Sequence, residues 1–292
     1  MNAEVRPLVF LGTPSAAATV LQRLIDDGFE VRHVITRPDA KRGRGSATTP
    51  SPVKEVAIAH GISVSHNLDW LKENNSAPML GIVVAYGRII PTAVLERTPM
   101  INVHFSLLPR WRGAAPVERA ILAGDTTTGV CIMEVEPTLD TGAVYACAEM
   151  AIDDSITADG LTAELSHLGA TLLVNTLRRG LGDPTPQAGE ATYAEKISAD
   201  EMRLNWSDDA VNLSRKVRCF RAFTMVQGNR VRIVEARPIE GDAPLGSVNQ
   251  QAQVGTGDGL LQLVRVQPEG KQAMDAQAWL RGRSDRDSVR FD

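Results

Sequence analysis

Leu8 to Pro14 read LVFLGTP, which is a run of four apolar residues followed by a glycine–proline turn. The apolar run predicts a buried strand, and an alanine-rich helical pattern follows it as far as Gly28. Further strands are expected at residues 31–36, 63–65, 79–85 and 100–104, with a helix at 53–60. Because strands that alternate with helices form βαβ units, we expect an α/β fold with a Rossmann-like, mostly parallel sheet and helices on both faces.

Ligands of such sheets bind at the carboxyl ends of the strands. The loops at 12–14, 85–87 and 102–109 begin at those ends. The first loop holds one glycine where a dinucleotide site requires the pattern G-x-G-x-x-G, so a tight turn is the better interpretation there. The sequence contains no HExxH, CxxC, P-loop or G-x-S-x-G motif.

The pattern changes about two thirds of the way along the chain. A helix at 114–123, strands at 128–135 and 144–152, and an amphipathic helix from Leu161 to Thr176 complete the first part. Proline and glycine then mark a linker at 181–205. Beyond Trp206, a basic helix and strands at 230–236, 248–254 and 260–266 predict a small, OB-like β-barrel. The expected domains are therefore 1–180 and 206–292, joined by that linker.

The bulk composition is that of an ordinary globular protein. Of the 292 residues, 43% are hydrophobic and 23% are charged, and no apolar run approaches the length of a membrane span. The first residues show no signal-peptide pattern, so we expect a cytoplasmic protein. Cys131, Cys147 and Cys219 lack metal-ligand spacing, and we expect them to be small core residues without a disulfide framework.

Basic residues cluster in two places, although the net charge of −4 argues against a strongly basic nucleic-acid binder. Residues 40–54 and 210–234 contain no acidic side chain. A solvated surface explains most such clusters, and an anionic partner is the alternative.

Asn102 and His104 occupy alternate positions at the end of one strand, so both side chains are expected on the same side of the sheet. Asp140 follows in the turn LDTG, residues 139–142. An amide can hold a developing oxyanion, an imidazole can move a proton, and a carboxylate can orient and charge that imidazole. Considered alone, His104 would be interpreted as a structural histidine, and Asp140 as an ordinary turn residue. Together they supply the groups that move an acyl-level carbon between two amines.

Seven segments together resemble the folate-dependent formyltransferases over essentially the whole chain. They are FLGTP (10–14), PSPVK (50–54), AYGRIIP (85–91), NVHFSLLPRWRGAAP (102–116), LDTG (139–142), QPEGK (267–271) and WLRG (279–282). The combination of Asn-x-His with Ser-Leu-Leu-Pro is highly specific for this superfamily. The RGAAP segment and the appended barrel are typical of its branch that acts on methionyl-tRNA.

The resemblance implies transfer of the formyl group of 10-formyltetrahydrofolate, without a metal, to the α-amine of initiator methionyl-tRNA. It implies that Asn102, His104 and Asp140 are catalytic. It also implies a folate pocket lined by Tyr86, Gly87, Arg88, Ile89, Ile90, Pro91, Ser106, Leu107, Leu108 and Pro109. The tRNA would contact Arg42, Arg44, Arg215, Lys216, Arg218 and Arg221, with a lysine-poor stretch at 46–49. We expect a monomer that does not bind membranes.

Three alternatives are also considered. A formyltransferase for a small amine, such as glycinamide ribonucleotide or an amino-sugar nucleotide, would not need residues 206–292. A 10-formyltetrahydrofolate hydrolase would use water as the acceptor and should not bind tRNA. A tRNA-binding module built on a degenerate enzyme fold is the third alternative, and the intact set of Asn102, His104 and Asp140 argues against it.

Overall fold

The computed structural model describes residues 6–41, 48–74, 78–219, 221–284 and 288–292. The chain forms two compact units. The first consists of Met1–Pro116, Thr127–Ala151 and Leu161–Glu195, and the second of Val117–Thr126, Ile152–Gly160 and Lys196–Asp292. Within the described ranges, no helix is long and apolar enough to cross a membrane.

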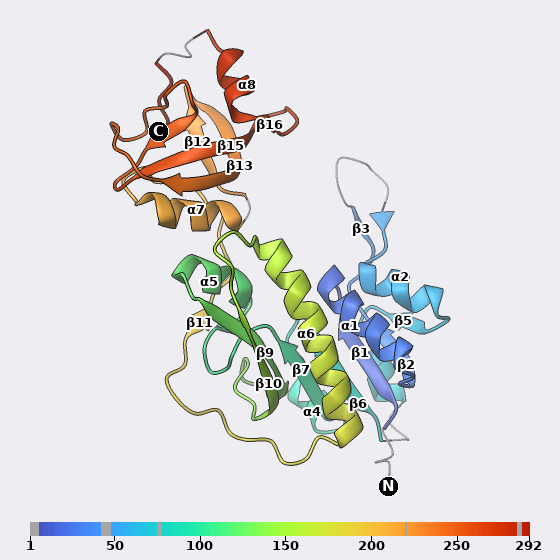
Figure 1. Ribbon diagram of the computed structural model, residues 1–292. Coiled ribbons are helices and arrows are strands. Elements are labelled where there is room, and N and C mark those ends of the chain that lie inside the picture. Colours follow the sequence, from blue (N-terminus) through green and yellow to red (C-terminus); the bar gives the residue numbers. More distant parts are fainter. Residues whose placement is uncertain (1–5, 42–47, 75–77, 220, 285–287) are drawn as a thin grey trace. The chain divides into compact units, whose positions relative to one another are not determined.

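A seven-stranded sheet in the order β10-β9-β7-β6-β1-β2-β5 forms the centre of the first unit (Figure 1). Its strands are β1 (Leu8–Gly12), β2 (Val31–Ile35), β5 (Ser63–Ser65), β6 (Leu80–Val84), β7 (Met100–His104), β9 (Thr127–Glu134) and β10 (Val144–Ala151). Five neighbouring strands, β5, β2, β1, β6 and β7, are parallel to one another. Next to β7, the strands β9 and β10 continue the sheet in antiparallel pairing. The predicted mostly parallel sheet is confirmed.

Helices cover both faces of this sheet, as predicted. One face carries α1 (Ser15–Asp26), α2 (Pro52–Ala59) and α6 (Ala158–Arg179). A Cβ at Gly169 of α6 would lie 2.8 Å from Val103 of β7, so the glycine allows close packing there. The other face carries α3 (Asp69–Glu73) and α4 (Thr92–Leu95), whose Leu71 and Val94 pack into one hydrophobic cluster with residues of β1, β2, β6 and β7.

Local sequence explains where these elements begin and end. Ser51 precedes α2, its Oγ accepts a hydrogen bond from the Lys54 amide at 3.0 Å, and Pro52 takes the first helical position. A Cβ at Gly12, where β1 ends, would lie 2.8 Å from the Cβ of Ala17 in α1. The glycine therefore permits a tight strand-to-helix turn.

Two small sheets lie in segments that the sequence presents as loop or linker. One joins β3 (Ala40–Lys41) to β4 (Thr48–Thr49), between the expected strand 31–36 and the expected helix 53–60. The other joins β8 (Arg112–Gly113) to β11 (Tyr193–Ala194) in parallel. The expected linker 181–205 thus contributes a strand, and its residues as far as Glu195 belong to the first unit.

Cys131 and Cys147 form a disulfide, which contradicts the expectation that the chain has none. They lie directly opposite one another in the antiparallel register of β9 and β10, with Cα atoms 4.2 Å apart. This pairing depends on the register of the hairpin, which a spacing of 16 residues does not reveal. Cys219 is a buried free thiol, as expected, and burial raises its pKa to about 12.

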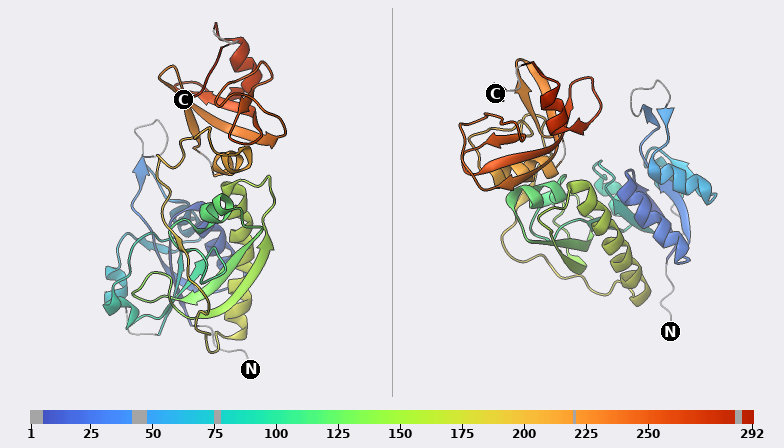
Figure 2. Two further views of the ribbon diagram at one scale, coloured as in Figure 1. Left: turned by 90° about the vertical axis from the view of Figure 1, so that its left-hand side faces the viewer. Right: turned by 45° about the horizontal axis from the view of Figure 1, so that its top comes forward.

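The second unit is a curved antiparallel sheet, a half-barrel (Figure 2). Its strands follow the order β12-β13-β15-β14, with β16 paired to β15. Its elements are α5 (Pro116–Ala123), which starts at the boundary, α7 (Ala210–Arg218), β12 (Phe223–Val226), β13 (Asn229–Ile239), β14 (Gln253–Gly255), β15 (Leu260–Pro268), β16 (Met274–Asp275) and α8 (Ala276–Arg281). Residues from the sheet, α7 and α8 share one buried cluster around Trp206, Trp279 and Phe291. The expected strand 248–254 is mostly loop, because Val248 makes only an isolated bridge to Val254.

Candidate active site

The loop after β7 turns back on His104. The His104 ring is buried, and its Nε2 lies 2.9 Å from the carbonyl oxygen of Trp111. Because a carbonyl only accepts hydrogen bonds, Nε2 must carry the proton of a neutral ring. The hydroxyl of buried Ser106 donates to the Arg110 carbonyl at 2.6 Å and helps close the same loop. Nδ1 of His104 is therefore left as a proton acceptor.

Asp140 faces this free nitrogen from the loop between β9 and β10. Its Oδ2 lies 3.8 Å from His104 Nδ1 and accepts a hydrogen bond from the Gly113 amide at 2.8 Å. The 3.8 Å separation is too long for a direct hydrogen bond, and the two groups form an ion pair only when the ring is protonated. Asp140 has a φ of 53°, a left-handed conformation that non-glycine residues seldom adopt. The structure thus brings His104 and Asp140 together.

Asn102 lies on the same face of β7, two residues before His104. β6 and β9 pair with the strand on either side, at Val83 and Met133 respectively. The side chain is half-buried, and its amide has no hydrogen-bond partner in the part of the chain that the structure describes. An amide in this state is an available hydrogen-bond donor on the face of β7 that also carries His104.

Residues 185–194, here called the strap, hold the loops that carry His104 and Asp140. At one end, Thr185 exchanges backbone hydrogen bonds of 2.8 and 2.9 Å with Val144, where β10 begins. At the other end, Thr192 accepts from the Trp111 amide at 2.9 Å through its hydroxyl, and from the Arg112 amide at 2.9 Å through its carbonyl. The strap is therefore fixed to both loops.

Gln187 links the two loops through its side chain. Its Nε2 donates to the carbonyls of Asp140 and Gly142, at 2.9 and 2.8 Å. Its Oε1 accepts from Nε and Nη2 of Arg112, at 3.0 and 2.7 Å. Sequence reasoning missed this residue, because it lies in an expected linker and 75 positions from its arginine partner.

The hairpin that carries Asp140 has one further support. The hydroxyl of Tyr145 in β10 donates to Oε1 of Glu134 in β9 at 2.9 Å. Burial, and then the neighbouring Glu134 carboxylate, raise the pKa of Tyr145 to about 12, so it stays a hydrogen-bond donor throughout the neutral range. This contact joins the two strands on either side of the Asp140 loop.

The structure divides the expected folate loop 86–91 into buried and exposed side chains. Tyr86 and Ile90 are buried in the cluster beneath the sheet, and burial raises the pKa of Tyr86. Arg37 holds the loop by donating to the Gly87 carbonyl at 3.0 Å, and Arg88 donates to the His66 carbonyl at 3.0 Å. Ile89 is 85% exposed and Pro91 is exposed. Gly87, Arg88, Ile89 and Pro91 are therefore the residues of this loop that a ligand can reach.

The second expected folate segment, 106–109, lies directly after His104. Leu107, Leu108 and Pro109 are half-buried, and the Leu108–Pro109 peptide bond is cis. Leu139, beside Asp140, is 61% exposed. Apolar surface is thus available on the loops that carry His104 and Asp140.

The residues expected to contact tRNA differ in their surroundings. Arg42 and Arg44 lie outside the described residues. Lys216 forms an ion pair with Asp208 at 2.9 Å, and Arg215 donates to Asn212 at 2.8 Å. Half-buried Arg218 donates to the carbonyls of Asp153 and Ile156 at 3.4 and 3.1 Å, and desolvation lowers its pKa. Arg221 is exposed and has a φ of 63°.

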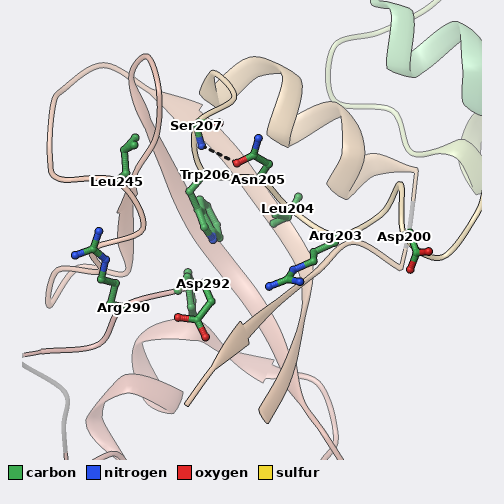
Figure 3. Close-up of a pocket in the computed structure, with 10 residues that line it drawn as sticks. Asp200, Arg203, Leu204, Asn205, Trp206, Ser207, Leu245, Arg290 and Asp292 are labelled. Carbon is green, nitrogen blue, oxygen red and sulfur yellow. Dashed lines mark hydrogen bonds between the residues drawn. The ribbon is translucent and has the colours of Figure 1, made fainter. Parts of the chain in front are cut away.

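A hollow of about 500 Å³ lies in the second unit (Figure 3). Arg203 and Arg290 line it, with Trp206 and Asp292 between them in the close-up. Neither guanidinium has a hydrogen-bond or ion-pair partner among the described residues. This hollow contains none of the three residues Asn102, His104 and Asp140. Nowhere in the described ranges could three or more His, Cys, Asp or Glu side chains hold a metal ion.

Two solved structures share this fold. The N-formyltransferase from Helicobacter canadensis, solved with folinic acid and dTDP-3-aminofucose, has a TM-score of 0.66 at 17% identity, covering 92% of this chain and 100% of its own. The methionyl-tRNA formyltransferase from Clostridium thermocellum has a TM-score of 0.60 at 17% identity, covering 79% of this chain and 92% of its own. At such identities the likeness shows the fold alone, and that fold occurs in enzymes with different acceptors.

Sequence comparison identifies the family. The model of the family described as formyl transferase matches residues 5–177, and the model of the formyl transferase C-terminal domain matches residues 196–284. The methionyl-tRNA formyltransferase of Methylococcus capsulatus is 42% identical over 294 residues, which cover 94% of this chain and 96% of that protein. The chain belongs to the formyl transferase family.

Proposed function

We propose that this chain transfers the formyl group of 10-formyltetrahydrofolate to the α-amino group of initiator methionyl-tRNA, as part of translation initiation. One observation carries the choice of acceptor, namely the 42% identity with a methionyl-tRNA formyltransferase over 94% of this chain. The fold does not choose the acceptor, because the Helicobacter canadensis enzyme covers 92% of the same chain. A second unit is therefore no argument against an amino-sugar acceptor, contrary to the reasoning from sequence alone.

The chemistry begins when the neutral α-amine attacks the formyl carbon. The carbon–nitrogen bond forms as the formyl oxygen becomes an oxyanion, and Asn102 would donate its free amide N–H to that oxygen. An oxyanion-hole donor of this kind contributes about 3–4 kcal/mol. The Asn102 amide supports this role, since it has no hydrogen bond among the described residues that must break before it binds the oxyanion.

His104 and Asp140 would manage the proton. The attacking nitrogen must lose a proton, and the leaving N10 of tetrahydrofolate must gain one. Nδ1 of His104 is free to accept, because Nε2 is held by the Trp111 carbonyl. Because Asp140 Oδ2 lies 3.8 Å from Nδ1, one amine nitrogen placed beside the pair would reach both acceptors, and the carboxylate would stabilise the positive charge while the proton is in transit.

The folate co-substrate would bind across the loops 86–91 and 106–109. Exposed Ile89 and Leu139 offer apolar contacts to a flat ring system, and the exposed backbone of the first loop offers hydrogen bonds. Among the residues expected from the sequence, Tyr86, Ile90 and Ser106 would shape the pocket from beneath, because their side chains are buried.

The tRNA would contact the second unit together with Arg42 and Arg44. Exposed Arg221 and half-buried Arg215 stay as proposed contacts, with Lys216 if it gives up Asp208. Arg218 is the weakest of the set, because its guanidinium already serves two carbonyls. Arg203 and Arg290 are added, since both line the hollow and have no partner within the described ranges.

The proposed division of labour follows the expected domains. Residues 1–180, together with the strap inside the expected linker 181–205, would carry out the chemistry, and residues 206–292 would bind tRNA. The protein would act as a monomer in the cytoplasm, where initiator tRNA is aminoacylated and used.

One assay separates the acceptors. Formyl transfer from 10-formyltetrahydrofolate is measured with methionyl-tRNA, uncharged tRNA, free methionine, a dTDP-linked amino sugar and water, side by side. We expect product with methionyl-tRNA and with none of the others. Faster transfer to the amino sugar would move the chain to the small-amine class, and release of formate without an amine acceptor would make it a hydrolase.

A further inference from the structure

Gln187 uses the full hydrogen-bonding capacity of its amide. Two N–H groups reach the carbonyls of Asp140 and Gly142, and the oxygen receives two N–H groups of Arg112. Carbonyls only accept and a guanidinium only donates, so just one orientation of the amide satisfies all four bonds. The side chain is half-buried although Thr185, Pro186 and Ala188 around it are exposed. The residue is therefore turned inward toward these partners.

These bonds close a ring around the carboxylate of Asp140. The Gly113 amide donates to Asp140 Oδ2, and the neighbouring residue Arg112 holds Gln187, which in turn holds the Asp140 carbonyl. The carboxylate and the backbone of one residue are thus fixed from the same two-residue strand, β8. This grip matters because Asp140 adopts a left-handed conformation, which residues with a Cβ adopt less readily than glycine does.

We propose that Gln187 is a positioning residue for formyl transfer, which aims the Asp140 carboxylate at His104 by holding the Asp140–Gly142 backbone. The inference rests on the proposed function. Gln187 lies at the far side of the Asp140 backbone and acts through it. Arg112 contributes to this positioning, because its two N–H donors bind Oε1 of Gln187 and so leave Nε2 facing the carbonyls of Asp140 and Gly142.

The replacement Gln187→Glu tests this with little change in shape. A glutamate keeps an oxygen for Arg112 but turns the other oxygen toward the Asp140 and Gly142 carbonyls, where donors are required. The loop should then shift and carry the Asp140 carboxylate with it. We expect kcat to fall by about tenfold to a hundredfold, because small misplacements of reacting groups have effects of this size. KM for both substrates should stay within about twofold, since binding surfaces are unchanged.

Two comparisons make the result specific. Ala188→Glu adds the same charge at the adjacent, exposed position and should leave kcat unchanged. In an Asp140→Asn background, Gln187→Glu should change kcat by less than about twofold, because both replacements remove the same contribution. If Gln187→Glu does not fold, Arg112→Met frees the other end of the amide, and the same kcat and KM pattern is expected from it.

The outcomes are distinguishable. Loss of kcat with unchanged KM, absent in the Asp140→Asn background, supports the proposal. Equal losses in both backgrounds, a change confined to KM, or wild-type kcat in Gln187→Glu while Asp140→Asn is impaired, each overturns it and leaves the proposed function standing. A wild-type chain that formylates no methionyl-tRNA overturns the proposed function, and this inference with it.

Discussion

Replacing Asn102 with alanine should lower kcat by about a hundredfold to a thousandfold, which corresponds to about 3–4 kcal/mol of transition-state stabilisation. The structure separates this effect from a loss of stability. β7 is hydrogen-bonded to β6 on one side and β9 on the other, and the Asn102 amide makes no hydrogen bond within the described ranges. Its removal breaks no hydrogen bond among the described residues, so the free energy of unfolding should change by less than about 1 kcal/mol.

The isosteric replacement Asn102→Asp should be slower than Asn102→Ala. A carboxylate cannot donate, and it places a negative charge where the formyl oxygen becomes an oxyanion. Two negative charges about 4 Å apart repel by about 4 kcal/mol at an effective dielectric constant of about 20. The aspartate variant should therefore lose a further factor of about 10² to 10³. This order distinguishes an oxyanion donor from a residue that only fills space.

Single-turnover formylation of methionyl-tRNA with enzyme in excess is the appropriate measurement, because product release cannot mask the chemical step. Thermal melting of each variant, compared with wild type, controls for folding. Retention of more than a tenth of the wild-type rate by Asn102→Ala would refute the assignment. An aspartate variant faster than the alanine variant would refute it as well, because it would show that no negative charge develops beside residue 102.

Four further changes have defined outcomes. Asp140→Asn retains an acceptor for the Gly113 amide but loses the charge, so kcat should fall about tenfold to a hundredfold in the same assay; an unchanged rate would exclude the charge from the mechanism. Burial lowers the pKa of His33 to about 4. The unfolded chain therefore takes up a proton that the folded chain refuses, and urea unfolding should show stability lost as pH falls from about 6.5 to 4, by up to about 3 kcal/mol. His33→Phe, which keeps the stack on Trp70, should lack this loss, and equal pH dependence would contradict it. Cys147→Ser opens a 16-residue loop and should destabilise oxidised protein by about 3 kcal/mol, but have no effect on protein melted in a reductant. Arg290→Ala should flatten the log–log salt dependence of tRNA affinity by about 0.7–0.9, whereas an unchanged slope would mean no phosphate contact.

Much of the fold could be predicted because its signals are local. The apolar runs that became β1, β2, β6 and β7 are buried, and the helical patterns between them became α1 and α2 at nearly the expected bounds. The short elements β3, β4, β8 and β11 were not predicted. Each has two residues and exists only because a partner strand lies beside it. Pairing between residues 112 and 193 leaves no trace in local periodicity.

The candidate site shows the same limit more sharply. Asn102 and His104 share one strand, so period-2 geometry was enough to place their side chains on one face. The meeting of His104 with Asp140, the bond between Gln187 and Arg112, and the pairing of Cys131 with Cys147 each depend on the register of β9 and β10 or on the path of the strap. Burial of individual side chains could not be predicted either. Tyr86, Ile90 and Arg218 lie in segments expected to contact ligands, but their side chains face inward.

The effects of replacements on kcat and KM should locate the boundary between the proposed catalytic and tRNA-binding parts of the chain better than the position of a linker does. Contacts with tRNA phosphates are present before and during the reaction, so their loss should raise KM and leave kcat nearly unchanged. Contacts that form or tighten in the transition state behave in the opposite way. Gln187 lies within residues 181–205 yet is bonded to the Asp140 backbone, so its replacement should affect kcat as Asn102 and Asp140 replacements do. By this criterion we expect the catalytic part of the chain to extend through the strap, and the connection to the proposed tRNA-binding part to begin after it.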